Sequence, residues 1–387
     1  MLANEMNINP KDNPLFLKTL EYHMQNPEIS LKEHLKNRVV ELGEEVLRYK
    51  RVYLDLNFWI YLQKASFGRP EKIEHLELYK ILVKAVDDGK ILCPISQPIF
   101  LELLKQSDET TRVPMFKMME QLSKGVTIQT EDERRSTEIV HFLKQNTLGS
   151  KSIYPLEQLV WTKIPYVLGY HYPDNEVAPK EQMLLIQKAF TDWLWTCSLE
   201  EIPEIFKKTN RFHLIEMTPV SDKINQGKFA HADQINSYKK AFMVELVGIL
   251  DLYKPRMNDI WCEMYKNETG KDISVEDKNF LLKSSSDPLG ALILLAFEKN
   301  RITTQLPTWR VGTSLHAMYR WDRNRKLKPN DLYDFDHAKA ALPYFDYFFT
   351  ERSLKNLVTT KQLSLDKIYS TQVVSDEKEA IEVLSKL

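Results

Sequence analysis

Four carboxylic acids are the side chains of this 387-residue chain best placed to do chemistry together. Asp55 and Glu351 each follow a short apolar run, the first directly and the second after a threonine. Glu102 lies within a predicted helix, and Asp334 begins another. Carboxylates that converge repel one another until a cation neutralises them, and oxygen ligands select Mg²⁺ or Mn²⁺. Such an ion generates a hydroxide and orients a phosphodiester for in-line attack, so these acids predict a metal-dependent nuclease.

Other polar side chains accompany the four acids. Asn57, Ser96 and Thr350 are expected to form hydrogen bonds that hold the metal ligands in place. Asp336 is a fifth candidate metal ligand, and the sequence does not decide whether Asp334 or Asp336 binds the metal. Asp346 is a further candidate for a residue that forms hydrogen bonds with the ligands. For any one acid taken alone, a solvated carboxylate or a helix cap is the competing interpretation.

A strip of basic side chains precedes the acid-rich helix. It comprises Arg320, Arg323, Arg325 and Lys326. Positive side chains attract phosphate, and the neighbouring rings of Tyr319 and Trp321 could stack on unpaired bases. The strip therefore predicts a nucleic-acid contact beside the acids, with a solvated helix face as the alternative.

Short apolar runs alternate with predicted helices near both ends of the chain. The runs are residues 52–54, 91–95, 126–128, 347–349 and 371–374. Helical spacing of apolar residues covers 15–50, 76–88 and 376–384, and Gly89 is expected to end one of these helices. This alternation indicates an α/β fold with a parallel sheet, which gathers its catalytic groups at the carboxyl ends of the strands.

The alternation stops in the middle of the chain, where long helical stretches are broken by prolines. We therefore expect an N-terminal helical segment at 1–50, one core in two parts at 51–130 and 330–387, and a large all-helical insertion at 131–329. An insertion of this length is expected to carry binding or regulation.

The composition argues against several other kinds of protein. The 53 basic and 54 acidic residues give a net charge of −1, so attraction to nucleic acid must be local. The three cysteines are far apart, which fits neither a disulfide framework nor a zinc site with paired ligands. The first residues lack the pattern of a secretory leader, and the longest apolar run, 289–297, is too short to cross a bilayer. We expect a cytoplasmic protein without membrane contact.

The order of these motifs resembles that of the PIN-domain nucleases. In that family a strand ends in Asp-x-Asn, a Ser precedes a helical Glu, a helix opens with Asp, and a later strand ends in Thr followed by an acid. The matching residues are Asp55 with Asn57, Ser96 with Glu102, Asp334, and Thr350 with Glu351. The interval of 16 residues from Asp334 to Thr350 (350 − 334) is also similar to the family's. Glu351 departs from the residue pattern of the family, because many members have Asp at this position.

The resemblance implies a PIN-like parallel sheet flanked by helices, Mg²⁺ or Mn²⁺ as cofactor, and an RNA endonuclease that leaves a 5′-phosphate and a 3′-hydroxyl. It leaves open an inhibitory protein partner or a homo-oligomer. One alternative is a PIN-like module without activity that binds nucleic acid or protein. Another is a metal-dependent phosphatase, which would leave the basic strip without a role.

Overall fold

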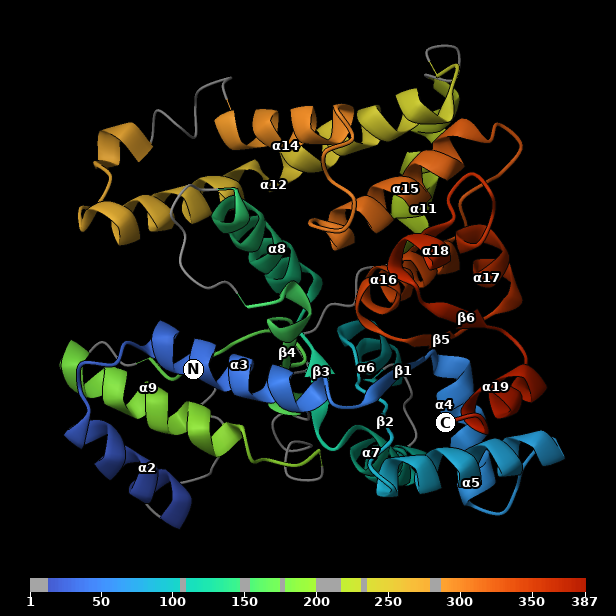
Figure 1. Cartoon of the computed structure of the whole chain (residues 1–387), viewed down its shortest axis with the longest axis horizontal. Coiled ribbons are helices and arrows are strands. Elements are labelled where there is room, and N and C mark those ends of the chain that lie inside the picture. The colour runs from blue at the N-terminus through green and yellow to red at the C-terminus, as the bar shows by residue number, and fades with distance from the viewer. Residues whose placement is uncertain are drawn as a thin grey trace.

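The computed structural model describes residues 13–104, 109–146, 154–174, 178–199, 217–230, 235–278 and 287–387. It is a mixed α/β structure in which a small parallel sheet lies among helices (Figure 1). Across these residues, no helix has both the length and the apolar composition that crossing a bilayer requires.

Four short strands form one parallel sheet. They are β1 (Lys50–Leu54), β2 (Ile91–Leu92), β5 (Tyr347–Phe349) and β6 (Gln372–Val374), in the spatial order β2-β1-β5-β6. β1 pairs with β5 so that Val52 lies beside Tyr347 and Leu54 beside Phe349. Strands of parallel sheets are covered on both faces, which explains why these segments are continuous apolar runs. The strands predicted in these four segments are confirmed.

Helices cover both faces of this sheet. In Figure 1, one group lies below β5 and β6 and comprises α4 (Leu56–Ser66), α5 (Ile73–Asp87) and α19 (Glu377–Leu384). A second group lies above them and comprises α16 (Pro329–Tyr344), α17 (Arg352–Val358) and α18 (Leu365–Tyr369). Two more helices, α6 (Gln97–Leu104) and α7 (Glu109–Ser123), follow β2 in the chain. As predicted, Gly89 ends α5, with a φ of 71° that suits glycine.

A second, two-stranded sheet corrects one expectation. β3 (Val126–Ile128) was a predicted strand, but its antiparallel partner β4 (Trp161–Lys163) lies in the segment expected to be all-helical. That expectation is wrong, because pairing with β3 makes a strand of three residues that show no alternation of their own. A parallel bridge from Ile95 to Thr127 joins the pair to the end of β2, and Trp161 is buried in the same core as the main sheet. The short 3-10 helices η2 (Leu156–Gln158) and η3 (Ile164–Tyr166) flank β4.

Three helices form a layer beside β4. They are α2 (Pro14–Gln25), α3 (Leu31–Val46) and α9 (Lys180–Leu194) (Figure 1). The predicted N-terminal helical segment is confirmed over α2 and α3, and residues 1–12 lie outside the described part of the chain. Gly43 of α3 lies directly against η2, because a Cβ at this position would be 1.9 Å from the carbonyl oxygen of Gln158. The side-chain amide of Gln158 donates to the carbonyl of Val40 at 2.9 Å, which holds α3 and η2 together.

Helices of the predicted insertion build a second core. It lies among α8 (Glu131–Gln145), α12 (Tyr238–Thr269), α14 (Pro288–Glu298) and α15 (Pro307–Trp321). Ile139, Leu246, Ile293 and Trp309 are buried in it. α15 packs against α16, as does α11 (Met217–Ala230), so the insertion contacts the helix that carries Asp334. Residues 147–153, 175–177, 200–216, 231–234 and 279–286 of the insertion lie outside the described residues.

Candidate active site

The strand order creates a ligand-binding position between β1 and β5. The chain runs outward from β1 to β2 and later returns to β5 on the other side of β1, so the strand order reverses between these two strands. Ligands of open parallel sheets bind at such a reversal, outside the carboxyl ends of the strands. Asp55 follows β1 at this point, and Thr350 and Glu351 follow β5. The amide of Asp55 donates to the carbonyl of Phe349 at 3.0 Å, so the two strand ends are joined where the acids begin.

Asp55 is buried and begins α4. It is the N-cap of this helix, and its Oδ1 accepts a hydrogen bond from the amide of Phe58 at 3.2 Å. Burial raises the pKa of Asp55 to about 6, and the negative charge of Glu351 acts in the same direction. A hydrogen bond from Thr350 opposes this rise in pKa. The predicted contact between Thr350 and an acid of the site is therefore present.

Asp334 lies within α16 rather than at its start, because the helix begins at Pro329. The pKa of Asp334 is raised to about 7, chiefly by burial and also by the charges of Glu351, Asp331 and Asp55, while the charge of His337 opposes the rise. The charges of Asp55 and Glu351 thus both act on Asp334, which makes the three acids one candidate site.

Glu351 is exposed but not without support. Asn57, in the first turn of α4, donates from Nδ2 to Glu351 Oε1 at 2.6 Å. This bond joins the helix that follows β1 to the residue that follows β5. Asn57 thus has the supporting contact with an acid that its position in the sequence predicts.

A buried histidine that the sequence motifs do not include lies among the acids. His337 Nε2 donates to Glu102 Oε2 at 3.0 Å, and His337 Nδ1 lies 2.7 Å from the hydroxyl of Tyr53. The same hydroxyl lies 2.7 Å from Ser96 Oγ, so Ser96 reaches Glu102 through two other side chains. His337 follows Asp334 by three residues, a spacing that puts both side chains on one face of α16. That spacing is the signal by which the sequence could have revealed it.

The charge of His337 is set by the acids. Burial disfavours its protonated form, but the hydrogen bond and charge of Glu102 and the charges of Asp55 and Asp334 outweigh burial, and its pKa is raised. An imidazolium in this position neutralises part of the negative charge of the four acids. His337 therefore links Glu102 electrostatically to Asp55 and Asp334.

Two predicted residues have other partners. Asp346 accepts hydrogen bonds from the amide and Nε of Arg51, each at 2.8 Å, at the amino end of β5 and away from Asp55. The prediction that Asp346 supports the metal ligands is wrong, because it instead fixes the start of the β1–β5 pair. Asp336 forms an ion pair with Lys339 at 2.6 Å, and Lys339 is buried beside Glu131. Asp334, not Asp336, is the acid of α16 that faces the site.

The basic strip is only partly exposed. Arg320 donates from Nε to Glu245 and so holds α15 against α12. The guanidinium carbon of Arg325 lies 4.5 Å from the centre of the Tyr319 ring, a cation–π contact. Arg323 and Lys326 are exposed, immediately before α16. The side chains of Arg320 and Arg325 are half-buried.

The donor atoms of the acids suit a hard cation. Asp55, Asp334 and Glu351 offer carboxylate oxygens, which Mg²⁺ and Mn²⁺ prefer. The pKa values of the two aspartates are raised mainly by burial and also by neighbouring carboxylates, whose repulsion a cation would relieve. Their oxygens are not gathered as tightly as a filled site requires. Within the described residues, the one group of three His, Cys, Asp or Glu whose ligand atoms lie within 4.8 Å of one another is found elsewhere, on α2, α3 and α9.

The raised pKa values predict how stability depends on pH. Between about pH 4 and pH 7 the folded protein holds protons on Asp55 and Asp334 that the unfolded chain has lost, so its free energy of unfolding should fall as the pH rises. His337 acts in the same direction, since a raised histidine pKa stabilises below the unfolded value and this stabilisation is lost as pH passes the folded value. In EDTA we expect the two aspartates alone to give a decrease of about 4 kcal/mol from pH 5 to pH 8, measured by urea unfolding.

The double variant Asp55→Asn/Asp334→Asn isolates this contribution. Asparagine caps a helix as well as aspartate does, so α4 keeps its N-cap. The variant should lose most of the decrease and be at least as stable as the parent at pH 8. An unchanged pH dependence would mean that the two carboxyl groups are ionised without repulsion. Other buried acids affect parent and variant alike.

The arrangement is thus a set of acids around a histidine at the reversal point of a parallel sheet. It could hold a divalent cation and a phosphodiester. No protein-family model, curated protein or solved structure matches this chain.

Proposed function

We propose that this protein is a metal-dependent ribonuclease of PIN-like type that hydrolyses phosphodiester bonds within RNA. The observation that supports it best is the group formed by Asp55 after β1, Asp334 in α16 and Glu351 after β5, in which the charge of Glu351 helps to raise the pKa of both aspartates. Acids whose pKa is raised by burial and by a neighbouring charge are costly, and they cluster where chemistry requires them. Their place at the strand-order reversal of a parallel sheet also favours a ligand site.

Each residue has a defined part in this proposal. Asp55, Asp334 and Glu351 hold the cation, and Asn57 fixes the carboxylate of Glu351. A bound Mg²⁺ or Mn²⁺ supplies Lewis acidity that makes water a nucleophile at neutral pH and neutralises charge on the phosphate. His337 keeps a proton on Nε2 toward Glu102, which fixes the carboxylate of Glu102 at the edge of the site.

A second candidate is a PIN-like module that binds without catalysis. The contact between His337 and Glu102 favours it, because a protonated histidine already neutralises one of the four acids inside the protein. In this case the acids would be retained without a metal, and RNA or protein would bind at the same edge of the sheet.

Cleavage of labelled RNA by the purified full chain distinguishes the two candidates. We expect cleavage with Mn²⁺ or Mg²⁺, none in excess EDTA, and recovery when the metal is restored, because the nucleophile depends on the cation. The products should carry a 5′-phosphate and a 3′-hydroxyl, as the family resemblance implies. Cleavage that persists through exhaustive chelation would refute the proposal, and metal-independent RNA binding without cleavage would favour the binding module.

The exposed end of the basic strip predicts where the RNA lies. Arg323→Ala/Lys326→Ala should weaken RNA binding and reduce its salt dependence by about two units of slope, one for each phosphate that a side chain no longer neutralises. Binding is best measured with the Asp334→Asn protein, so that the RNA stays intact.

A matched control removes the same charge elsewhere. Lys266→Ala/Lys271→Ala changes the last turn of α12 and the segment just after it, at the end of α12 that lies across the molecule from α16 (Figure 1). It should leave the salt slope unchanged. Equal slopes for the two double variants would mean that the strip is a solvated surface.

A further inference from the structure

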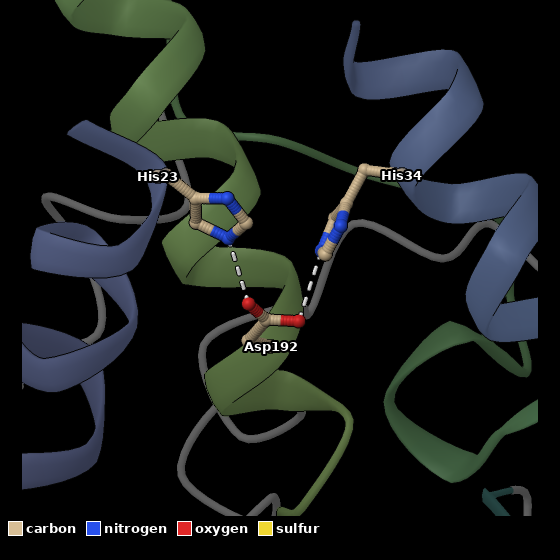
Figure 2. Close-up of side chains that lie close together, drawn as sticks. All are labelled: His23, His34 and Asp192. Carbon is tan, nitrogen blue, oxygen red and sulfur yellow. Dashed lines mark hydrogen bonds and ion pairs between the residues drawn. The ribbon is translucent and has the colours of Figure 1, made fainter. Parts of the chain in front are cut away.

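A second set of metal-ligand side chains lies on the helical layer formed by α2, α3 and α9. Figure 2 shows His23 of α2 and His34 of α3 on either side of Asp192 of α9, with both imidazole rings directed at its carboxylate. His23 Nε2 lies 2.8 Å from Asp192 Oδ2, and His34 Nε2 lies 2.9 Å from Asp192 Oδ1. This set has no residue in common with the acids of the proposed nuclease site.

The three side chains form a built site rather than a surface cluster. His23 is 0% exposed, His34 9% and Asp192 4%. Arg38 donates from Nε and Nη2 to Asp192 Oδ1 at 2.9 and 2.7 Å, so the carboxylate is fixed from a second side. Ligating carboxylates in metal sites are held by hydrogen bonds of this kind. The two imidazole rings are nearly perpendicular, at 82°, with their centres 4.6 Å apart.

The spacing of the donor atoms is close to that of a metal site. One nitrogen of each histidine and one carboxylate oxygen lie within 4.8 Å of one another. Ligands about 2.0–2.1 Å from a tetrahedral ion are about 3.3 Å apart, so modest side-chain shifts would admit the ion. Each histidine would then carry its hydrogen on Nδ1 and use the Nε2 lone pair, a change of tautomer without net loss of a proton.

A cleft beside this group leaves room for a further ligand. Its volume is about 410 Å³, and His34, Arg38 and Asp192 line it together with Lys18, Thr19 and Tyr22. Two imidazoles and one carboxylate with an open position are the ligands of catalytic zinc sites and of related transition-metal sites. The metal preference of this group also differs from that of the acids of the proposed nuclease site, because imidazole nitrogen favours zinc-class ions over Mg²⁺.

We propose that His23, His34 and Asp192 bind a divalent transition-metal ion of the zinc class, with one coordination position open to the cleft. The ion joins α2, α3 and α9 and is separate from the Mg²⁺ or Mn²⁺ of the nuclease site. The competing explanation is a purely structural network, in which Asp192 serves only to accept hydrogen bonds from the two histidines and Arg38.

Titration of the chelator-stripped full chain with Zn²⁺ and Co²⁺ tests this proposal. We expect one equivalent to bind with a dissociation constant in the micromolar range or tighter, visible absorption of the Co²⁺ form typical of low coordination number, and a rise in melting temperature with Zn²⁺. His34→Gln and, separately, Asp192→Asn should each weaken binding by about 100-fold or more and abolish the rise. Using two variants guards against one that fails to fold, which circular dichroism would reveal.

Two control variants test whether a loss of zinc binding is specific to the proposed ligands. His141→Gln removes a buried histidine of α8 that contacts the carbonyl of Tyr154, and it should bind zinc as the parent does. Asp55→Asn/Asp334→Asn should also keep zinc affinity, so a failed nuclease assay and a failed zinc titration can be told apart. A folded parent that binds neither ion at tens of micromolar, or a His34→Gln protein with parental affinity, would show the network to be structural only.

Discussion

Asp334→Asn is expected to lower metal-dependent RNA cleavage by about 10³-fold or more while the protein stays folded. The cation supplies several kcal/mol of transition-state stabilisation, and a neutral amide at this position removes charge that holds it. Because burial and neighbouring charges make the carboxylate of Asp334 costly, the apo protein should not lose stability. Cleavage rates at saturating Mn²⁺, together with urea unfolding of the same preparations, measure both effects.

Asp336→Asn is the matched control for this variant. It changes the same functional group on the same helix, two residues away, but its partner is Lys339 rather than the other acids. Its cleavage rate should stay within about tenfold of the parent, and its stability should fall because Lys339 loses a partner in a buried position. If Asp336→Asn were the inactive protein and Asp334→Asn the active one, the assignment of the metal ligand on α16 would be reversed.

Among the glycines that the structure describes, Gly43 is expected to be the one where substitution by alanine destabilises the protein most. The new Cβ would lie 1.9 Å from the carbonyl oxygen of Gln158 and 2.7 Å from its carbonyl carbon, so the backbone of η2 would have to move. Because backbone cannot yield as a flexible side chain does, we expect a decrease of about 3 kcal/mol or more in the free energy of unfolding. Urea unfolding measures it.

Gly248→Ala provides the comparison. Gly248 lies in α12, and a Cβ there would meet no atom within 4 Å. The same substitution should therefore stabilise the protein by about 0.5–1 kcal/mol, through helix propensity alone. Similar effects of the two substitutions would mean that η2 does not lie against α3 in solution.

The parts of the fold that could be predicted are those with a strong local signal. The runs at 52–54 and 347–349 are apolar throughout because both faces of a parallel sheet are covered, and they form β1 and β5. β4 could not be predicted, since Trp161–Lys163 is a strand only through its partner β3. Division of the chain by sequence pattern also missed that Trp161 is buried in the same core as the main sheet.

The same distinction applies to the site. Asp55 and Glu351 were predicted because each follows an apolar strand, and that position follows from topology. His337 was missed because its spacing from Asp334 places it on the same face of α16 but does not show that it contacts Glu102, which only the fold does. Asp346 was assigned wrongly because its partner, Arg51, lies 295 positions away and is brought to it only by the pairing of β1 with β5.

The pairing of β1 with β5 has a consequence for how the chain folds. Arg51 and Asp346, which meet at the start of this pair, are 295 positions apart in the sequence. Contacts between residues so far apart in the sequence form slowly, because the entropy cost of closing a large loop comes before the contacts contribute any stabilising free energy. During synthesis, the fully buried residues of β1 must therefore wait for their partner strand, and until it arrives Val52, Tyr53 and Leu54 form an apolar edge at risk of aggregation.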